Sequence, residues 1–359
     1  MSSCAEPGTK DPVKTRALRS AVVRRALFAV GAVGLGCCLG QASFAAGRAA
    51  PLRQVQTIAL DGVEGRIDHM AIDAPNRRLF VAALGNGTVE VLDLRSGRRI
   101  QSMRGFHEPQ GLGFVASPPR LFVSNGGGGT CDVFDGATLA HLRTLQLPDD
   151  ADNIRCDTAA RRVYVGCGEG ALRALDATTG DSLGSILLPG HPESFQLERA
   201  GPRVFVNVPD ASQVVIVDRV KGRVIGRIAI RGFSANFPMA LDEDAHRLFV
   251  GCRRPSAVLV FDDRSERRLS TVPIDGDADD LFYDGATRQL FASCGAGFID
   301  VLGMRRGRLT MAAKIATAPG ARTALYVPAL RRLYLAVPRR GGQRPEIRVF
   351  DAAPRPIAR

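Results

Sequence analysis

One short segment recurs seven times along this chain, and this repetition constrains the fold more than any other feature. Each copy places a polar or basic residue before alternating apolar and aromatic positions, as in RLFVA from Arg78. The copies begin at Arg78, Arg120, Arg162, Arg203, Arg247, Gln289 and Arg332. Their spacings are 42, 42, 41, 44, 42 and 43 residues. A β-rich repeat of about 40–45 residues is typical of propeller blades, so seven copies predict an all-β, seven-bladed β-propeller.

A second repeated segment follows each first one and confirms the register. In six copies it ends in aspartate: Asp93, Asp135, Asp176, Asp218, Asp262 and Asp351. The remaining copy ends at Leu302. An aspartate followed by a short turn, often with glycine, is typical of a β-hairpin. We therefore predict four antiparallel strands in each blade, with the first segment as the second strand and the aspartate segment as the third.

The seventh blade lacks a fourth strand of its own, because few residues follow Asp351. A segment with the character of a fourth strand, Val55–Leu60, precedes the first blade instead. We expect this segment to complete the last blade, which would close the ring and remove an exposed sheet edge. The propeller is thus predicted over residues 55–351, with a C-terminal tail at 352–359.

The first 45 residues have the pattern of an export signal. A basic stretch ends at Arg24-Arg25, an apolar run covers residues 26–39, and residues 43–45 fit a small-x-small cleavage site. The apolar run is shorter than the ~20 residues of a membrane span. We predict a signal peptide at 1–45, a short linker at 46–54, no transmembrane anchor after cleavage, and a periplasmic or secreted protein. Twin-arginine export and an uncleaved anchor are the alternatives.

The cysteines of the mature chain fall on positions that other blades fill mainly with apolar residues. They are Cys131, Cys156, Cys167, Cys252 and Cys294. Free cysteine packs as a small hydrophobe, so we expect free thiols. The chain contains no Cys-x-x-Cys-His motif, and covalent haem is therefore not expected. Cys37 or Cys38 in the leader is an alternative lipidation site.

Polar residues occupy matching positions just before the first strand of each blade. Ten residues before each first segment stand Asp68, Gln110, Asp152, Glu193, Phe237, Asp279 and Arg322. The next residues are His69, Gly111, Asn153, Ser194, Pro238, Asp280 and Thr323. Loops that enter the innermost strands meet at one mouth of the central channel, so these side chains should converge. We predict ligand binding by Asp68, His69, Gln110, Asp152, Asn153, Glu193, Asp279, Asp280 and Arg322.

Four of the seven side chains at the first of these positions are carboxylates, in a chain whose formal net charge is +12. Converging carboxylates raise one another's pKa unless a cation or hydrogen-bond donors compensate them. Arg322, His69 and neighbouring amides are candidate compensators, and a divalent cation such as calcium is another. Removal of Asp152 and Asp279 should then relieve repulsion and leave the fold intact. The alternative is that these residues are only turn formers.

The two repeated segments resemble those of the YncE-like, YVTN-repeat family of bacterial β-propellers, which have WD40-like repeats. The resemblance covers about residues 55–351. It implies an exported binding protein, and single-stranded DNA binding has been associated with the group. Related seven-bladed folds include lactonases and redox-cofactor domains, so the resemblance indicates architecture better than function.

The function expected first is that of an exported, non-enzymatic binding or scaffold protein. It would use the channel mouth, as a monomer, to hold a small molecule or a partner protein segment. One alternative is a metal-assisted lactonase or related hydrolase, in which carboxylates hold a cation that polarises a carbonyl or activates water. A second is single-stranded nucleic-acid binding, with Phe106, Phe233 and Phe237 as stacking candidates. No catalytic residue is assigned.

Overall fold

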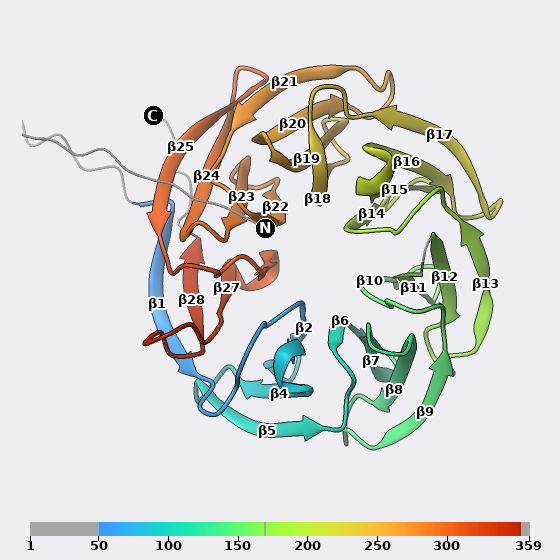
Figure 1. The fold of residues 1–359 in the computed structure, drawn as a ribbon, viewed down its shortest axis with the longest axis vertical. Coiled ribbons are helices and arrows are strands. Elements are labelled where there is room, and N and C mark those ends of the chain that lie inside the picture. Colours follow the sequence, from blue (N-terminus) through green and yellow to red (C-terminus); the bar gives the residue numbers. More distant parts are fainter. Residues whose placement is uncertain (1–49, 169, 353–359) are drawn as a thin grey trace, which may run out of the picture. The chain divides into compact units, whose positions relative to one another are not determined.

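The protein, described here as a computed structural model over residues 50–168 and 170–352, forms a closed ring of seven sheets (Figure 1). Each sheet has four antiparallel strands, which confirms the predicted seven-bladed propeller. The predicted signal peptide and all but the first residue of the predicted tail lie outside the described residues. Within the described part of the chain, no helix is long and apolar enough to cross a membrane.

Two strands of each blade lie nearest the channel. The innermost are β2 (Met70–Asp73), β6 (Pro109–Ala116), β10 (Ile154–Asp157), β14 (Phe195–Leu197), β18 (Ser234–Asp242), β22 (Ala278–Asp284) and β26 (Ala324–Val327). The second strands carry the first repeated segment. They are β3 (Arg78–Ala83), β7 (Pro119–Asn125), β11 (Arg162–Cys167), β15 (Arg203–Val208), β19 (Arg247–Arg254), β23 (Gln289–Cys294) and β27 (Arg332–Val337).

The outer half of each blade holds the aspartate strand and an edge strand. The third strands are β4 (Thr88–Asp93), β8 (Thr130–Asp135), β12 (Ala171–Asp176), β16 (Gln213–Asp218), β20 (Ser256–Asp262), β24 (Phe298–Arg305) and β28 (Glu346–Ala352). The outermost are β5 (Arg98–Arg104), β9 (His141–Gln146), β13 (Ser182–Leu187), β17 (Arg223–Ala229), β21 (Arg268–Pro273), β25 (Arg308–Ala316) and β1 (Leu52–Ala59). Short 3-10 helices η1 (Leu84–Asn86), η2 (Pro209–Ala211) and η3 (Pro328–Leu330) follow three of the inner strands.

The second strands are buried on both faces because each sheet packs against its two neighbours. After its first residue, β3 is wholly buried, and the same is true of β11, β15 and β23. The outermost strands are largely exposed, as shown by β17 with Ile228 as its buried residue. The core is therefore a set of clusters between successive blades, and the apolar run of the first repeated segment is what fills them.

The ring closes as expected, through pairing of β1 with β28. Leu52 lies opposite Ala352 and Ala59 opposite Glu346, with one irregularity between Gln54 and Gln56. β1 starts at Leu52, three residues before the predicted start, because the Leu52 side chain is buried against the cluster that includes Phe350. The strand thus takes in residues that the sequence analysis left to the linker.

The repeated aspartate at the end of the third strand forms the predicted turn. Asp135 Oδ1 accepts hydrogen bonds from the backbone N–H groups of Ala137 at 3.0 Å and Thr138 at 2.8 Å. These bonds to the charged form are the main reason that the pKa of Asp135 is lowered from its ordinary value. Equivalent pairs of bonds form at Asp176 and Asp218.

In three blades, the arginine that opens the first repeated segment bonds to the following blade, as Arg78 does to the carbonyls of Gly136 and Ala137. Arg120 Nε donates to the carbonyl of Thr178 at 2.9 Å, in the following blade. Arg203 Nη1 does the same to the carbonyl of Asp263 at 2.5 Å, while its Nη2 lies 3.2 Å from Asp263 Oδ1. The repeat therefore carries an inter-blade contact as well as a buried strand.

All five cysteines of the described residues are free, as the repeat register predicted. Four of them are buried, and Cys156 is half-buried. Burial raises the pKa of the Cys156 and Cys252 thiols to about 12. These thiols therefore stay protonated at neutral pH and pack as apolar groups.

We predict that deletion of residues 51–60 opens the ring and lowers the melting temperature strongly, because β28 loses its partner strand. The single substitution Ile58→Ala should cost about 2–5 kcal/mol of unfolding free energy, since Ile58 is 1% exposed. Thermal and urea unfolding measure both effects. Thr57→Ala, on the exposed face of the same strand, is the control. A deletion protein as stable as the parent contradicts the closure.

A second prediction concerns the inter-blade arginine. Arg203→Gln should lower the unfolding free energy by about 1.5–3 kcal/mol, because the buried Asp263 carboxylate loses a charged donor. The exposed Arg227 on β17 provides a matched control, whose change to Gln should cost less than about 0.5 kcal/mol. Urea unfolding of both variants decides the matter, and equal stabilities would show that the arginine contact adds nothing.

Candidate functional site

The loops before the innermost strands meet at one end of the channel, around a cavity of about 20 Å³ that we name the mouth cavity. Its lining comes from several blades and is strongly polar. The residues are Arg66, Asp68, His69, Asp152, Asn153, Glu193, Ser194, Phe237 and Asp279. The structure thus brings together six of the nine predicted ligand residues, since counting back from each second strand finds positions that share one place in the ring.

Two of the mouth carboxylates are buried without adequate donors. Asp68 is fully buried, and Arg66 Nη2 lies 2.7 Å from its Oδ2. His69 Nε2 lies between two acids, 3.8 Å from Asp68 Oδ1 and 3.6 Å from Asp152 Oδ1. Within the described residues, neither Asp68 oxygen nor Asp152 Oδ1 accepts a hydrogen bond, because the Arg66 contact lacks the required alignment. These oxygens are held only by electrostatic contacts.

The side-chain oxygen of Asn153 is a further buried acceptor at the mouth without a donor among the described residues. Asn153 is 2% exposed, and its Nδ2 donates to Asp152 Oδ2 at 3.2 Å. Its Oδ1 is buried and accepts no hydrogen bond from the described part of the chain. A buried acceptor without a donor is costly, so this oxygen points to a donor that the chain itself does not supply.

The acids on the other side of the mouth are neutralised. Arg322 Nη1 lies 2.9 Å from Asp277 Oδ1, and its Nε lies 3.0 Å from Asp279 Oδ2. Arg253 bonds to Asp279 Oδ1 and lies 3.4 Å from Asp277. These four side chains form a closed square of alternating charge, which we name the arginine–aspartate square. It carries no net charge.

The pKa values of Asp68, Asp152 and Glu193 follow from this arrangement. Burial is the largest cause in each case, and neighbouring carboxylates add to it. The pKa of Asp152 rises to about 7 and that of Glu193 to about 8, against opposing effects of His69 on Asp152 and Arg253 on Glu193. The pKa of Asp68 is also raised, mainly by burial. The mouth therefore favours the binding of a proton or of another positively charged group.

Three predicted residues do not line the mouth cavity. Gln110 turns away from the mouth cavity and donates to Asp150 Oδ1 at 3.0 Å. Asp280 lines the channel below, and Arg322 belongs to the arginine–aspartate square. The expected effect of removing Asp279 also needs correction: its loss would leave Arg253 and Arg322 short of a partner rather than relieve repulsion.

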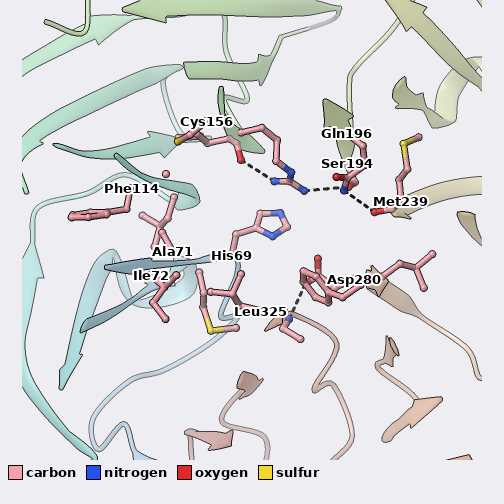
Figure 2. A pocket seen from close by; sticks show the side chains of 18 residues that line it. His69, Ala71, Ile72, Phe114, Cys156, Ser194, Gln196, Met239, Asp280 and Leu325 are labelled. Atoms are coloured by element: carbon pink, nitrogen blue, oxygen red, sulfur yellow. Dashed lines mark hydrogen bonds between the residues drawn. The ribbon is translucent and has the colours of Figure 1, made fainter. Parts of the chain in front are cut away.

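The central channel continues from the mouth as a larger cavity of about 310 Å³ (Figure 2). Residues from the innermost strands of all seven blades line it, and most are apolar, as Met70, Ile154 and Leu281 illustrate. His69 and Ser194 line both cavities, so the two are adjacent. Figure 2 shows the His69 imidazole pointing into this space.

Sequence reasoning missed three arginines of this region. Arg66 precedes the ring position by two residues, Arg253 lies just beyond a second-strand segment, and Arg155 lies on β10 in the channel wall. Comparison between blades would have found the last one. The other blades place Ala71, Gly113, Gln196, Ala240, Phe282 and Leu325 at the position of Arg155, all uncharged.

The phenylalanines considered for nucleic-acid stacking are not free platforms. Phe106 is 9% exposed and packs in the cluster between two blades. The Phe237 ring lies under the Arg253 guanidinium at 4.0 Å, and Phe233 has Arg268 at 5.5 Å. In the described part of the chain, no group of three or more His, Cys, Asp or Glu side chains is arranged to hold a metal ion. A calcium ion at the mouth stays a prediction of the sequence.

The raised pKa values predict how stability depends on pH. A carboxyl whose folded pKa exceeds its unfolded value binds more protons when folded, so stability falls as pH rises from about 4 to about 8. Asp152→Asn should therefore resemble the parent near about pH 5 and exceed its stability by one to a few kcal/mol near about pH 8.5. Urea unfolding at both pH values measures this. The exposed Asp61→Asn is the control, and a difference that does not grow with pH would contradict the assignment.

Comparison with known proteins agrees with this architecture. No protein-family model matches the chain. The YncE proteins of Salmonella typhimurium (strain LT2) and Salmonella typhi, both named as uncharacterized, are 22% identical to it over 218 residues. The match covers 56% of this chain and only 61% of each relative. Hydrazine synthase of Kuenenia stuttgartiensis superposes with a TM-score of 0.68 at 15% identity, over 77% of this chain and 94% of that one, which supports the fold alone. The chain is thus a seven-bladed β-propeller distantly homologous to the YncE proteins.

Proposed function

We propose that this protein is an exported, non-enzymatic binding protein that holds a small cationic group of its ligand, a primary ammonium, in the mouth cavity. The observation that carries the proposal is the set of buried acceptors without donors: the oxygens of Asp68, Asp152 Oδ1 and Asn153 Oδ1. An ammonium group supplies three N–H donors for these four oxygens and one positive charge for the carboxylates.

The size and charge of the mouth support an ammonium in particular. The cavity of about 20 Å³ holds a group of about the size of one water molecule. Asp68, Asp152 and Glu193 face Arg66 and His69, whereas the arginine–aspartate square balances itself. A bound cation would stabilise the ionised carboxyls and draw their raised pKa values down.

The surroundings of the Ser194 hydroxyl at the mouth agree with a protein that binds its ligand without catalysing a reaction. Ser194 Oγ accepts a hydrogen bond from Arg155 Nη2 at 3.3 Å, which occupies it with a guanidinium rather than a base. Export rests on the signal pattern of residues 1–45 and on the resemblance to an exported family. The distant homology to YncE proteins adds no activity, because those relatives are themselves uncharacterized.

Calorimetry with n-butylammonium and spermidine tests the proposal. The parent should bind, and Asp152→Asn should weaken binding by about tenfold or more, since a charge-assisted hydrogen bond contributes about 1.5–3 kcal/mol. Glu193→Gln should also weaken it, because Glu193 lines the same cavity. Asp61→Asn should bind as the parent does. Equal affinities in all four proteins, or no amine binding by the parent, would refute an ammonium site.

A further inference from the structure

The channel below the mouth contains an arginine that the proposed function does not use. Arg155 Nη1 donates to the carbonyl of Ile154 at 2.8 Å, and Nη2 donates to Ser194 Oγ at 3.3 Å. Among the described residues, no carboxylate oxygen lies within 4.0 Å of this guanidinium. Its positive charge therefore faces the channel with neutral partners only.

The nearest acid on the channel wall does not balance this charge. Asp280 is 7% exposed, and its Oδ2 accepts a hydrogen bond from the backbone N–H of Ala324 at 2.7 Å. Burial raises the pKa of Asp280 well above its usual range, and no ion pair joins this carboxyl to Arg155. Burial also lowers the pKa of Arg155, against the smaller opposing effects of Asp280 and Asp152.

The geometry suits a carboxylate from outside the chain. A guanidinium has five N–H donors arranged as a fork, and the hydrogen bonds to Ile154 and Ser194 occupy two of those of Arg155. A bidentate pairing with a carboxylate is the strongest use of the rest. The cavity of about 310 Å³ is at the lower end of small-molecule pockets, and Met70, Ile154 and Leu281 give it apolar walls.

The two charged sites are adjacent and share lining residues. Ser194 lines both cavities and bonds to Arg155, and His69 lines both cavities and contacts Asp68 and Asp152. We infer that the ligand is a small zwitterion with an apolar body, whose ammonium lies in the mouth cavity and whose carboxylate pairs with Arg155. This inference rests on the proposed function for its ammonium half, while Arg155 and the channel carry the carboxylate half.

The test compares molecules that have one or both charges. The probes are L-leucine and the dipeptide glycyl-L-leucine as zwitterions, 3-methylbutylammonium as the amine alone, and 4-methylpentanoate as the acid alone. Calorimetry would use the parent, Arg155→Gln, Asp152→Asn and the control Arg227→Gln. Arg155→Lys keeps the charge without the fork, and thermal melting of each variant checks that it is folded.

A zwitterion should bind the parent about tenfold or more tightly than the amine does. Arg155→Gln should abolish that gain and leave amine binding unchanged, and Arg155→Lys should restore part of it. Asp152→Asn should weaken the zwitterion and the amine while leaving the acid unaffected. Binding of either L-leucine or glycyl-L-leucine with these effects of the variants supports the inference. The zwitterion that binds more tightly then indicates the distance between the ammonium and carboxylate groups of the ligand.

The failures are distinguishable. If the amine binds through Asp152 but neither zwitterion binds more tightly, or Arg155→Gln changes nothing, the inference is overturned and the ammonium site stands. If the acid binds through Arg155 while no amine binds, the proposed function fails and the zwitterion fails with it.

Discussion

Pairing between β1 and β28 is the constraint on which the rest of the molecule depends. It joins residues at opposite ends of the described chain, with Leu52 opposite Ala352. Each blade has the same inner loop, but seven such loops face a common centre only when the ring is complete. The mouth cavity and the channel are therefore products of closure, and no single blade contains either of them. Closure also removes the sheet edges that an open ring would expose.

Acidic side chains from several blades lie close together at the mouth, and their charges are balanced to different extents on its two sides. Asp277 and Asp279 are paired with Arg253 and Arg322, so that side of the mouth is a balanced ion network. Asp68, Asp152 and Glu193 are left with raised pKa values and few donors. A fold selected for stability alone gains nothing from buried, poorly paired carboxyls. Perturbed acids gathered in a cavity are a mark of function, and this distinguishes these three carboxyls from the arginine–aspartate square.

The sequence predicted the parts of the molecule that repetition reveals. The first repeated segment gave every second strand because both faces of that strand are buried in all blades, and equal offsets located the mouth carboxylates. A feature that occurs in one blade only shows in a comparison between blades as an exception, but its role does not. Arg155 replaces an uncharged residue of the other blades, and nothing local announces that its side chain faces the channel. Gln110 and Asp280 show the same limit: position in a repeat fixes where a side chain starts, whereas its neighbours decide where it points.

The inter-blade arginines have a consequence for how the molecule comes apart. Arg120 and Arg203 bond to turns that belong to the following blades, so the last turn of one blade is held by its predecessor. In linear repeat arrays, local opening can begin at an end and spread through nearest neighbours. A closed ring with such contacts has no terminal repeat at which local unfolding can begin. Unfolding of one blade removes packing contacts from both neighbouring blades. We therefore expect the propeller to open in one cooperative event, with slow amide exchange of similar rate in all seven sheets.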